Sequence, residues 1–187
     1  LRRQTKDPDG EATSLTNLGE AYAKLGEMEK AREDFERALA ILGVGGSANR
    51  HKLVRALRGL GALSRNIKDY DKGRECLDEA LSISRAIHDQ NGEASVLAEL
   101  ARLDFDRGNL QAAHRLAEES LSAFELLRLR VLSPNLRASL VASARQVQEL
   151  NIEILQRLHA AQPGSSLDAA AFREAERGRA RSLLEVL

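Results

Sequence analysis

Aromatic residues are scarce in this chain: they make up 3% of its 187 residues, and tryptophan is absent. Proline is also rare, with three residues in the whole sequence. Because strands favour β-branched and aromatic residues, a composition dominated by leucine and alanine indicates helices instead of sheets. The apolar content of 43% is ordinary, so the chain has enough apolar residues to build a core.

Net charge, disulfides and long apolar runs are missing as well. The 28 basic and 28 acidic residues cancel, so no overall field attracts nucleic acid or anionic lipid. A single cysteine excludes an internal disulfide. No apolar run approaches the roughly 20 residues of a membrane span, and no signal-peptide pattern opens the chain. We therefore expect a cytoplasmic protein with no membrane or nucleic-acid partner, cut from a longer polypeptide because it opens on Leu1.

The residue types that carry catalysis do not assemble into a site. Cys76 and His88 are twelve residues apart on one predicted helix, a separation of about 18 Å that is too long for proton transfer. Cys76 fits better as a small packing residue beside Leu77. The other three histidines stand on separate predicted helices without the spacing of metal ligands. The glycine-rich stretch 43–46 lacks the lysine and Ser/Thr of a phosphate loop, which makes it a connector. We predict no catalytic residue, metal site or cofactor.

An internal repeat organises the sequence. The string "DPDGEA" at 7–12 recurs as "DQNGEA" at 89–94, and two copies of 40–42 residues would fill the interval. Small residues mark the copies at Gly19, Gly61 and Ala101. The following helices repeat in the same register, at Ala31, Phe35 and Ala38, then Gly73, Leu77 and Ala80, then Ala113, Ala117 and Ser120.

Close packing explains a glycine inside a helix. Glycine costs a helix interior about 1 kcal/mol relative to alanine. Two antiparallel helices approach closely only where side chains are small, so we predict that Gly19 meets Ala31, with Tyr22 and Phe35 around them. Gly26 then ends the first helix in the left-handed conformation. The residues assigned to this packing are Leu18, Gly19, Tyr22, Ala31, Phe35, Ala38, Leu60, Gly61, Leu77, Ala80, Leu100, Ala101 and Ala113.

The pattern of Leu-Gly, then Tyr, then Ala, Phe and Ala across two helices resembles the tetratricopeptide repeat. The usual period is 34 residues, and these copies are longer. The resemblance implies an all-α fold, a right-handed superhelical array of antiparallel helix pairs in extended repeats of 40–42 residues. Such arrays bind proteins.

The expected helices follow from this register. Residues 1–6 are the tail of a truncated preceding helix, residues 7–131 hold three repeats, and residues 132–187 form an irregular terminal helix pair. Pro134 breaks the chain, and "QPGSS" at 162–166 is a turn. The predicted helices cover 10–25, 28–43, 48–66, 70–88, 92–107, 110–131, 136–161 and 167–187.

The terminal helix pair resembles the segment between the repeats and the caspase-like domain of bacterial CHAT-domain proteins. The resembling residues are Ser133, Pro134, Leu136, Arg137, Ala138 and Ser139, then Ala171, Phe172, Glu176, Arg177, Ala180, Arg181, Ser182, Leu183 and Leu184. The resemblance implies a protease domain downstream, whose His and Cys lie outside this chain. We expect Phe172, Arg177, Arg181, Leu183 and Leu184 to form the junction with that domain.

The tetratricopeptide resemblance also implies a groove lined by the first helix of each pair. Its candidate residues here are Lys24, Arg55, Arg58, Arg65, Arg102 and Phe105. Arginine suits bidentate recognition of carboxylates, so we expect an acidic protein or peptide partner. The alternative is that these arginines are solvated and satisfied by neighbouring acids. One aromatic residue in the groove is too few for a stacking platform for single-stranded nucleic acid.

Two functional interpretations stay open. The chain is either the partner-recognition or regulatory arm of a CHAT-domain protein or a free-standing tetratricopeptide adaptor. A His and Cys in a caspase-like pattern beyond Leu187 would separate the two.

Overall fold

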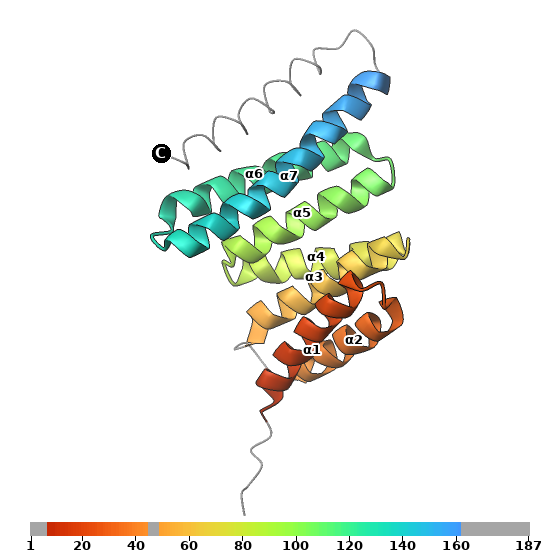
Figure 1. Ribbon diagram of the computed structural model, residues 1–187, viewed down its shortest axis with the longest axis vertical. Helices are drawn as coiled ribbons and strands as arrows, with labels where there is room; N and C mark the ends of the chain where they lie inside the picture. Colours follow the sequence, from red (N-terminus) through yellow and green to blue (C-terminus); the bar gives the residue numbers. More distant parts are fainter. Residues whose placement is uncertain (1–6, 45–48, 162–187) are drawn as a thin grey trace, which may run out of the picture. The chain divides into compact units, whose positions relative to one another are not determined.

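The computed structural model describes residues 7–44 and 49–161. Seven helices and no strand form within these residues, which confirms the predicted all-α class (Figure 1). Each helix predicted there is present, with its ends within two residues of the expected positions. The bounds are α1 Pro8–Lys24, α2 Met28–Val44, α3 Arg50–Asn66, α4 Tyr70–Ala86, α5 Gln90–Asp106, α6 Leu110–Arg130 and α7 Pro134–Ala161.

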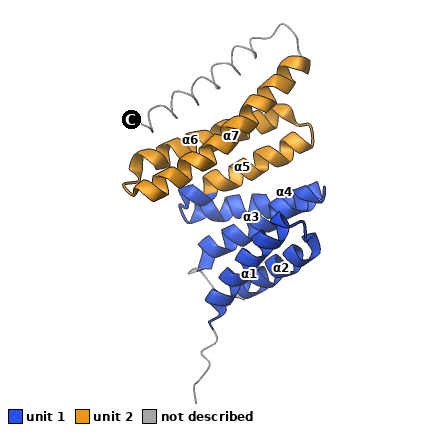
Figure 2. Ribbon diagram, viewed as in Figure 1, with its two compact units in different colours: residues 1–92 blue, residues 93–187 orange. Residues whose placement is uncertain are grey.

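The chain divides into two compact units, residues 1–92 (unit 1) and 93–187 (unit 2), shown in Figure 2. The predicted boundary at residue 131, between three repeats and a terminal pair, stays a prediction. The expected helix tail at 1–6 and the expected last helix lie outside the described residues. The junction candidates Phe172, Arg177, Arg181, Leu183 and Leu184 fall in that last segment. None of the helices in the described part of the chain is long and apolar enough to cross a membrane.

The recurring "D-x-x-G" string begins two helices in the same way. The Asp7 carboxylate accepts a hydrogen bond from the Gly10 amide at 2.9 Å, and Asp89 accepts one from the Gly92 amide at 2.8 Å. Such a cap satisfies one of the free amides at a helix start. A Cβ at Gly92 would lie 2.8 Å from the Asp89 carboxyl carbon, so glycine leaves room for the capping side chain. The first and third copies therefore share this capping geometry, whereas Asn49 at the start of α3 makes no side-chain cap bond.

Unit 1 packs around the ring of Phe35 on α2. A Cβ at Gly19 of α1 would lie 3.0 Å from three atoms of this ring, and a Cβ at Gly59 of α3 would lie 2.6 Å from its Cζ. We predicted that Gly19 meets Ala31 with Phe35 beside them, and the three atoms nearest to a Cβ at Gly19 all belong to Phe35. Sequence reasoning missed Gly59, which brings α3 against the same ring.

The second helix pair of unit 1 repeats this contact with a smaller side chain. A Cβ at Gly61 would lie 2.9 Å from Leu77 Cδ2 and 3.2 Å from the backbone oxygen of Gly73. Gly73 and Leu77 are the equivalents of Ala31 and Phe35, so the register read from the sequence places the right residues together here.

Most residues assigned to repeat packing are buried, and Leu18 is the exception. The buried ones are Gly19, Ala31, Phe35, Ala38, Leu60, Gly61, Leu77, Ala80, Leu100, Ala101 and Ala113, and Tyr22 is half-buried. Leu18 is 47% exposed, whereas Leu60 at the equivalent position of α3 is 6% exposed. The expectation that Leu18 packs inside the repeat is therefore wrong for the described residues, because no helix among them covers that face of α1.

Unit 2 has one apolar core shared by α5, α6 and α7. It includes Phe105, Phe124, Val147 and Ile154. Pro134 stands at the first position of α7, where its missing N–H and fixed φ suit a helix start. The proline predicted to break the chain thus also begins the next helix, two residues earlier than expected.

Candidate partner-binding surface

The face formed by α1 and α3 in unit 1 carries four of the predicted groove residues. One of them, Arg55, lies beside an acid. Arg55 donates from Nε to Glu20 Oε1 at 3.0 Å and from a terminal nitrogen to Glu20 Oε2 at 2.6 Å. This bidentate pair is partly exposed, so its contribution to stability is small. For Arg55 the alternative interpretation, satisfaction by a neighbouring acid, describes the geometry.

Arg58 follows one turn later on α3 and differs from Arg55. Its side chain is half-buried, and it makes no hydrogen bond or ion pair with the described residues. Lys24 follows Glu20 by one turn on α1, is exposed and is likewise without such a partner. Arg65, near the end of α3, is half-buried and has a partner of its own. Of the four predicted groove residues on this face, Arg58 and Lys24 are therefore the two whose positive charge has no partner among the described residues.

In unit 2 the predicted groove residues already have partners within the unit. Arg102 on α5 pairs with Glu99 at 2.7 Å and donates to Gln146 Oε1 of α7 at 3.4 Å. Phe105 is 8% exposed, and the Arg157 guanidinium of α7 lies 4.1 Å from the centre of its ring. This is a cation–π contact. Phe105 is thus a core residue, and its predicted place in an open groove is corrected because α7 packs over this side of α5.

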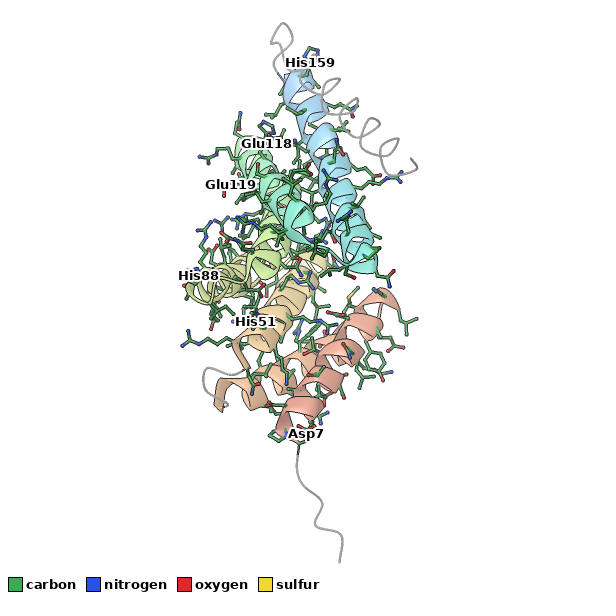
Figure 3. The ribbon with its side chains drawn as sticks, turned by 90° about the vertical axis from the view of Figure 1, so that its left-hand side faces the viewer. Asp7, His51, His88, Glu118, Glu119 and His159 are labelled. Atoms are coloured by element: carbon green, nitrogen blue, oxygen red, sulfur yellow. The ribbon has the colours of Figure 1, made fainter. Side chains whose placement is uncertain are left out.

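Sequence reasoning missed a polar network between α6 and α7. Asn151 is 0% exposed; its Oδ1 lies 2.8 Å from His114 Nδ1, and its Nδ2 donates to Glu118 Oε1 at 2.6 Å. Because Asn151 Oδ1 can only accept, His114 Nδ1 carries the proton. Figure 3 shows Glu118 on α6. The sequence did contain a signal for this network. Asn151 interrupts the apolar stripe of α7 between Val147 and Ile154, and α6 carries two polar residues, His114 and Glu118, four positions apart.

The described residues hold no cluster of His, Cys, Asp and Glu that could bind a metal ion. His51 Nδ1 lies 3.0 Å from Asp89 Oδ2, a pair that links α3 to the cap of α5 within unit 1. Cys76 is buried, and burial raises the pKa of its thiol, while Lys72 nearby offsets only part of that effect. A buried thiol with a raised pKa is a poor nucleophile.

We expect alkylation of Cys76 to be slow in the folded chain. At pH 8 the thiolate fraction is lowered by the raised pKa, and the reagent reaches the sulfur only when α4 opens. Iodoacetamide should modify the native protein at least ~10-fold more slowly than the chain in denaturant. Equal rates in both conditions would show that Cys76 is an accessible, reactive thiol.

Two tetratricopeptide-repeat family models match the chain, over residues 12–42 and 52–125. Residues 12–42 and 52–125 are tetratricopeptide repeats. Among curated proteins, the chain is 30% identical over 118 residues to the "Regulatory protein AfsR" of Streptomyces griseus and 27% identical to that of Streptomyces coelicolor. Each match covers 63% of the chain and 12% of the relative, so the chain spans a small part of these proteins.

Solved structures share the fold. The chain is similar to BtubC (BKLC) from P. vanneervenii, with a TM-score of 0.75 and 22% identity over 97% of this chain and 67% of that one. It is also similar to a putative kinesin light chain with nearly identical TPR-like repeats from P. anserina, with a TM-score of 0.59 and 20% identity over 97% of this chain and 94% of that one. At these identities the likeness shows the fold alone. Tetratricopeptide repeats generally mediate protein–protein binding, which makes the chain a protein-interaction module.

Proposed function

We propose that the α1–α3 face of unit 1 binds an acidic or carboxylate-bearing segment of a protein partner through Arg58 and Lys24. The observation that carries this proposal is the half-buried Arg58 guanidinium without an acid beside it, next to Arg55, which has one. Partial burial without a partner leaves hydrogen-bonding capacity unused, and a carboxylate fits the guanidinium fork in two parallel bonds.

The proposed site is narrower than the groove expected from the sequence. Arg55 and Arg102 already pair with Glu20 and Glu99, and a partner carboxylate would have to displace those acids to reach them. Phe105 lies in the core of unit 2. Among the predicted groove residues, Arg58 and Lys24 are therefore the cations that a partner can engage without breaking a contact of the described chain.

The test compares binding of acidic and basic peptide pools by fluorescence anisotropy. We expect the parent chain to prefer acidic peptides, and Arg58→Glu to weaken their binding at least ~10-fold because the carboxylate would then face a like charge. Binding should also weaken as salt rises, since exposed charges are screened over about 8–10 Å at physiological ionic strength.

The matched control is Arg50→Glu. Arg50 is an exposed cation on the same helix with no partner among the described residues, and it begins α3 about 12 Å from Arg58 at 1.5 Å per residue. This variant changes the net charge equally and should bind as the parent does. Equal loss in both variants, or equal binding of both peptide pools, would contradict a site at Arg58.

The second part of the proposal concerns the kind of protein to which this module belongs. The resemblance around residues 133–139 favours the regulatory arm of a bacterial CHAT-domain protein acting in the cytoplasm, and the name of the streptomycete relatives is compatible with a regulatory role. A free-standing adaptor agrees equally well with the repeats. Sequencing the gene downstream of Leu187 decides: a caspase-like His and Cys supports the first setting, and their absence supports the adaptor.

A further inference from the structure

The turn from α6 into α7 in unit 2 carries a cluster of exposed leucines (residues 126–136, the leucine corner). Leu126 and Leu129 lie in the last two turns of α6, Leu132 lies in the link that follows, and Leu136 lies in the first turn of α7. Their exposed fractions are 54%, 71%, 91% and 50%. A single exposed leucine is ordinary, whereas a cluster of this kind marks an interaction site.

The leucine corner projects beyond the core of unit 2. On α6 the core contacts end with Leu127 and Val131, and on α7 the first buried residue is Leu140. The six residues 134–139 before it are all exposed. Since one helical turn holds 3.6 residues, no face of this stretch of α7 is buried. Figure 1 shows the turn at one end of the unit 2 helices. The described residues therefore form a projecting edge here.

The link at the leucine corner is short and tied to α7. Only residues 131–133 separate Arg130, the end of α6, from Pro134, the start of α7. The Arg137 guanidinium donates to the backbone oxygen of Val131 at 2.9 Å, which joins α7 to the link. Leu132 is therefore held outward by a short, braced link, so that little ordering is needed when it binds.

The leucine corner is positively charged, although the whole chain is neutral. Residues 125–139 hold three arginines and one glutamate, a net formal charge of three minus one, or +2. The glutamate, Glu125, pairs with Arg128 at 2.8 Å. Arg137 has no acidic partner among the described residues. A guanidinium has five N–H donors, and the bond to Val131 uses one of them.

We propose that the leucine corner docks the protein on an anionic lipid surface, with its leucines among the acyl chains and Arg137 at the lipid phosphates. A bilayer interface places phosphates beside an apolar interior, which complements a projecting apolar edge with cations next to it. Arginine binds phosphate through paired N–H donors. Our expectation of no membrane partner rested on the neutral chain and the missing membrane span, and neither criterion detects a local edge.

Two other occupants fit this edge less well. A second copy of the chain would place its own corner of charge +2 against this one, and like charges facing each other oppose association. A protein partner normally buries roughly 1,000 Å² or more against a complementary surface, so it would need a cavity shaped to the exposed first turn of α7. A bilayer deforms and accepts a projecting edge without such a cavity.

Vesicle sedimentation tests the proposal with the 187-residue chain. Vesicles that mix phosphatidylcholine with phosphatidylglycerol provide the anionic surface, and vesicles of phosphatidylcholine alone provide the neutral one. We expect binding to the anionic vesicles that weakens as salt rises. Leu132→Glu should lower this binding at least ~10-fold, because it removes a buried leucine from the bound state. Arg137→Gln, which removes one charge but keeps an amide donor, should lower it about 5-fold.

The chain supplies a matched control for each variant. Leu25, in the turn between α1 and α2, is 75% exposed, and Arg50 is an exposed cation without a partner among the described residues. Leu25→Glu and Arg50→Gln should bind the anionic vesicles as the parent does. No binding to these vesicles, or equal losses in the variants and their controls, would overturn the proposal.

A fluorescent label reports insertion directly. In a chain with Cys76→Ala, an environment-sensitive dye on Leu132→Cys should shift its emission to shorter wavelength when anionic vesicles are added, whereas the same dye on Leu25→Cys should not. Binding without a shift at residue 132 would place another surface on the lipid. Slow labelling of residue 132 in the absence of vesicles would show that protein already covers the corner. Either result would contradict docking through the leucines.

Discussion

Replacing Gly59 by alanine should destabilise unit 1, although alanine is the better helix former. The added Cβ would lie 2.6 Å from Phe35 Cζ, so the ring or α3 must move. Overpacking of this kind costs about 1–3 kcal/mol, which exceeds the gain of up to about 1 kcal/mol in helix propensity. Thermal unfolding followed by circular dichroism should show a lower melting temperature, by about 2–4 °C for each kcal/mol in a chain of 187 residues.

Substitutions at other glycines distinguish the cost of overpacking from the gain in helix propensity. Gly43 on α2 has no atom within 4 Å of a Cβ, so Gly43→Ala should be neutral or stabilising. Gly19→Leu should destabilise as Gly59→Ala does, because Gly19 faces the same ring. Phe35→Leu combined with Gly59→Ala should recover part of the loss by shortening the opposing side chain. A higher melting temperature for Gly59→Ala would show that α2 and α3 do not pack through this glycine.

Gly59 also shows how far the sequence predicts this fold. Helix ends, caps and the contact of Gly61 with Leu77 lie within one repeat, and the recurring positions of three copies determine them. Gly59 contacts the helix of the preceding repeat, a relation that depends on the offset between two repeats. A second glycine in "RGLG" was visible, but nothing in its local pattern indicated which helix it would meet.

The contacts of the candidate site were also hard to predict, because they too depend on how helices of different repeats pack together. The sequence placed arginines on the first helices, but Glu20 and Arg55 are 35 residues apart, and their pairing depends on how α1 lies beside α3. Phe105 occupies a position expected to face a groove, yet α7 covers it. Because α7 lacks the repeat pattern, its packing over α5 could not be inferred from the register.

The largest single effect that we expect in unit 2 comes from an isosteric change, Asn151→Asp. Asn151 donates to Glu118 Oε1 at 2.6 Å from a position with 0% exposure. The change replaces this donor with a carboxylate oxygen, and two carboxylates at hydrogen-bond distance cannot both ionise. An uncompensated buried charge costs about 3–5 kcal/mol, which is the upper limit here because His114 still donates to the other carboxylate oxygen. Chemical denaturation at pH 7 should show a loss of this order.

The pH dependence of this loss has a definite sign. In the folded variant, burial and Glu118 would raise the pKa of the introduced carboxyl above its unfolded value, and the hydrogen bond from His114 Nδ1 to the other oxygen would offset part of that rise. Its destabilising effect is absent below the unfolded pKa, which is about 3.9 for aspartate, and grows as the pH rises. The difference in unfolding free energy between variant and parent should therefore shrink as the pH is lowered from 7 toward about 4.

A second substitution tests whether Glu118 is the cause. Asn151→Asp combined with Glu118→Gln restores a donor opposite the new carboxylate, since the glutamine amide can donate to it, and should recover most of the lost stability. Glu119→Gln removes the same charge from the next position of α6 (Figure 3), which is exposed as Glu118 is but does not bond to Asn151, and should recover little. Parent-like stability of Asn151→Asp at pH 7, or equal rescue by Glu119→Gln, would mean that the Asn151–Glu118 bond does not hold α7 against α6. If the rescue is specific to Glu118, this part-buried bond fixes how α7 packs on α6, and with it the cover that α7 places over Phe105.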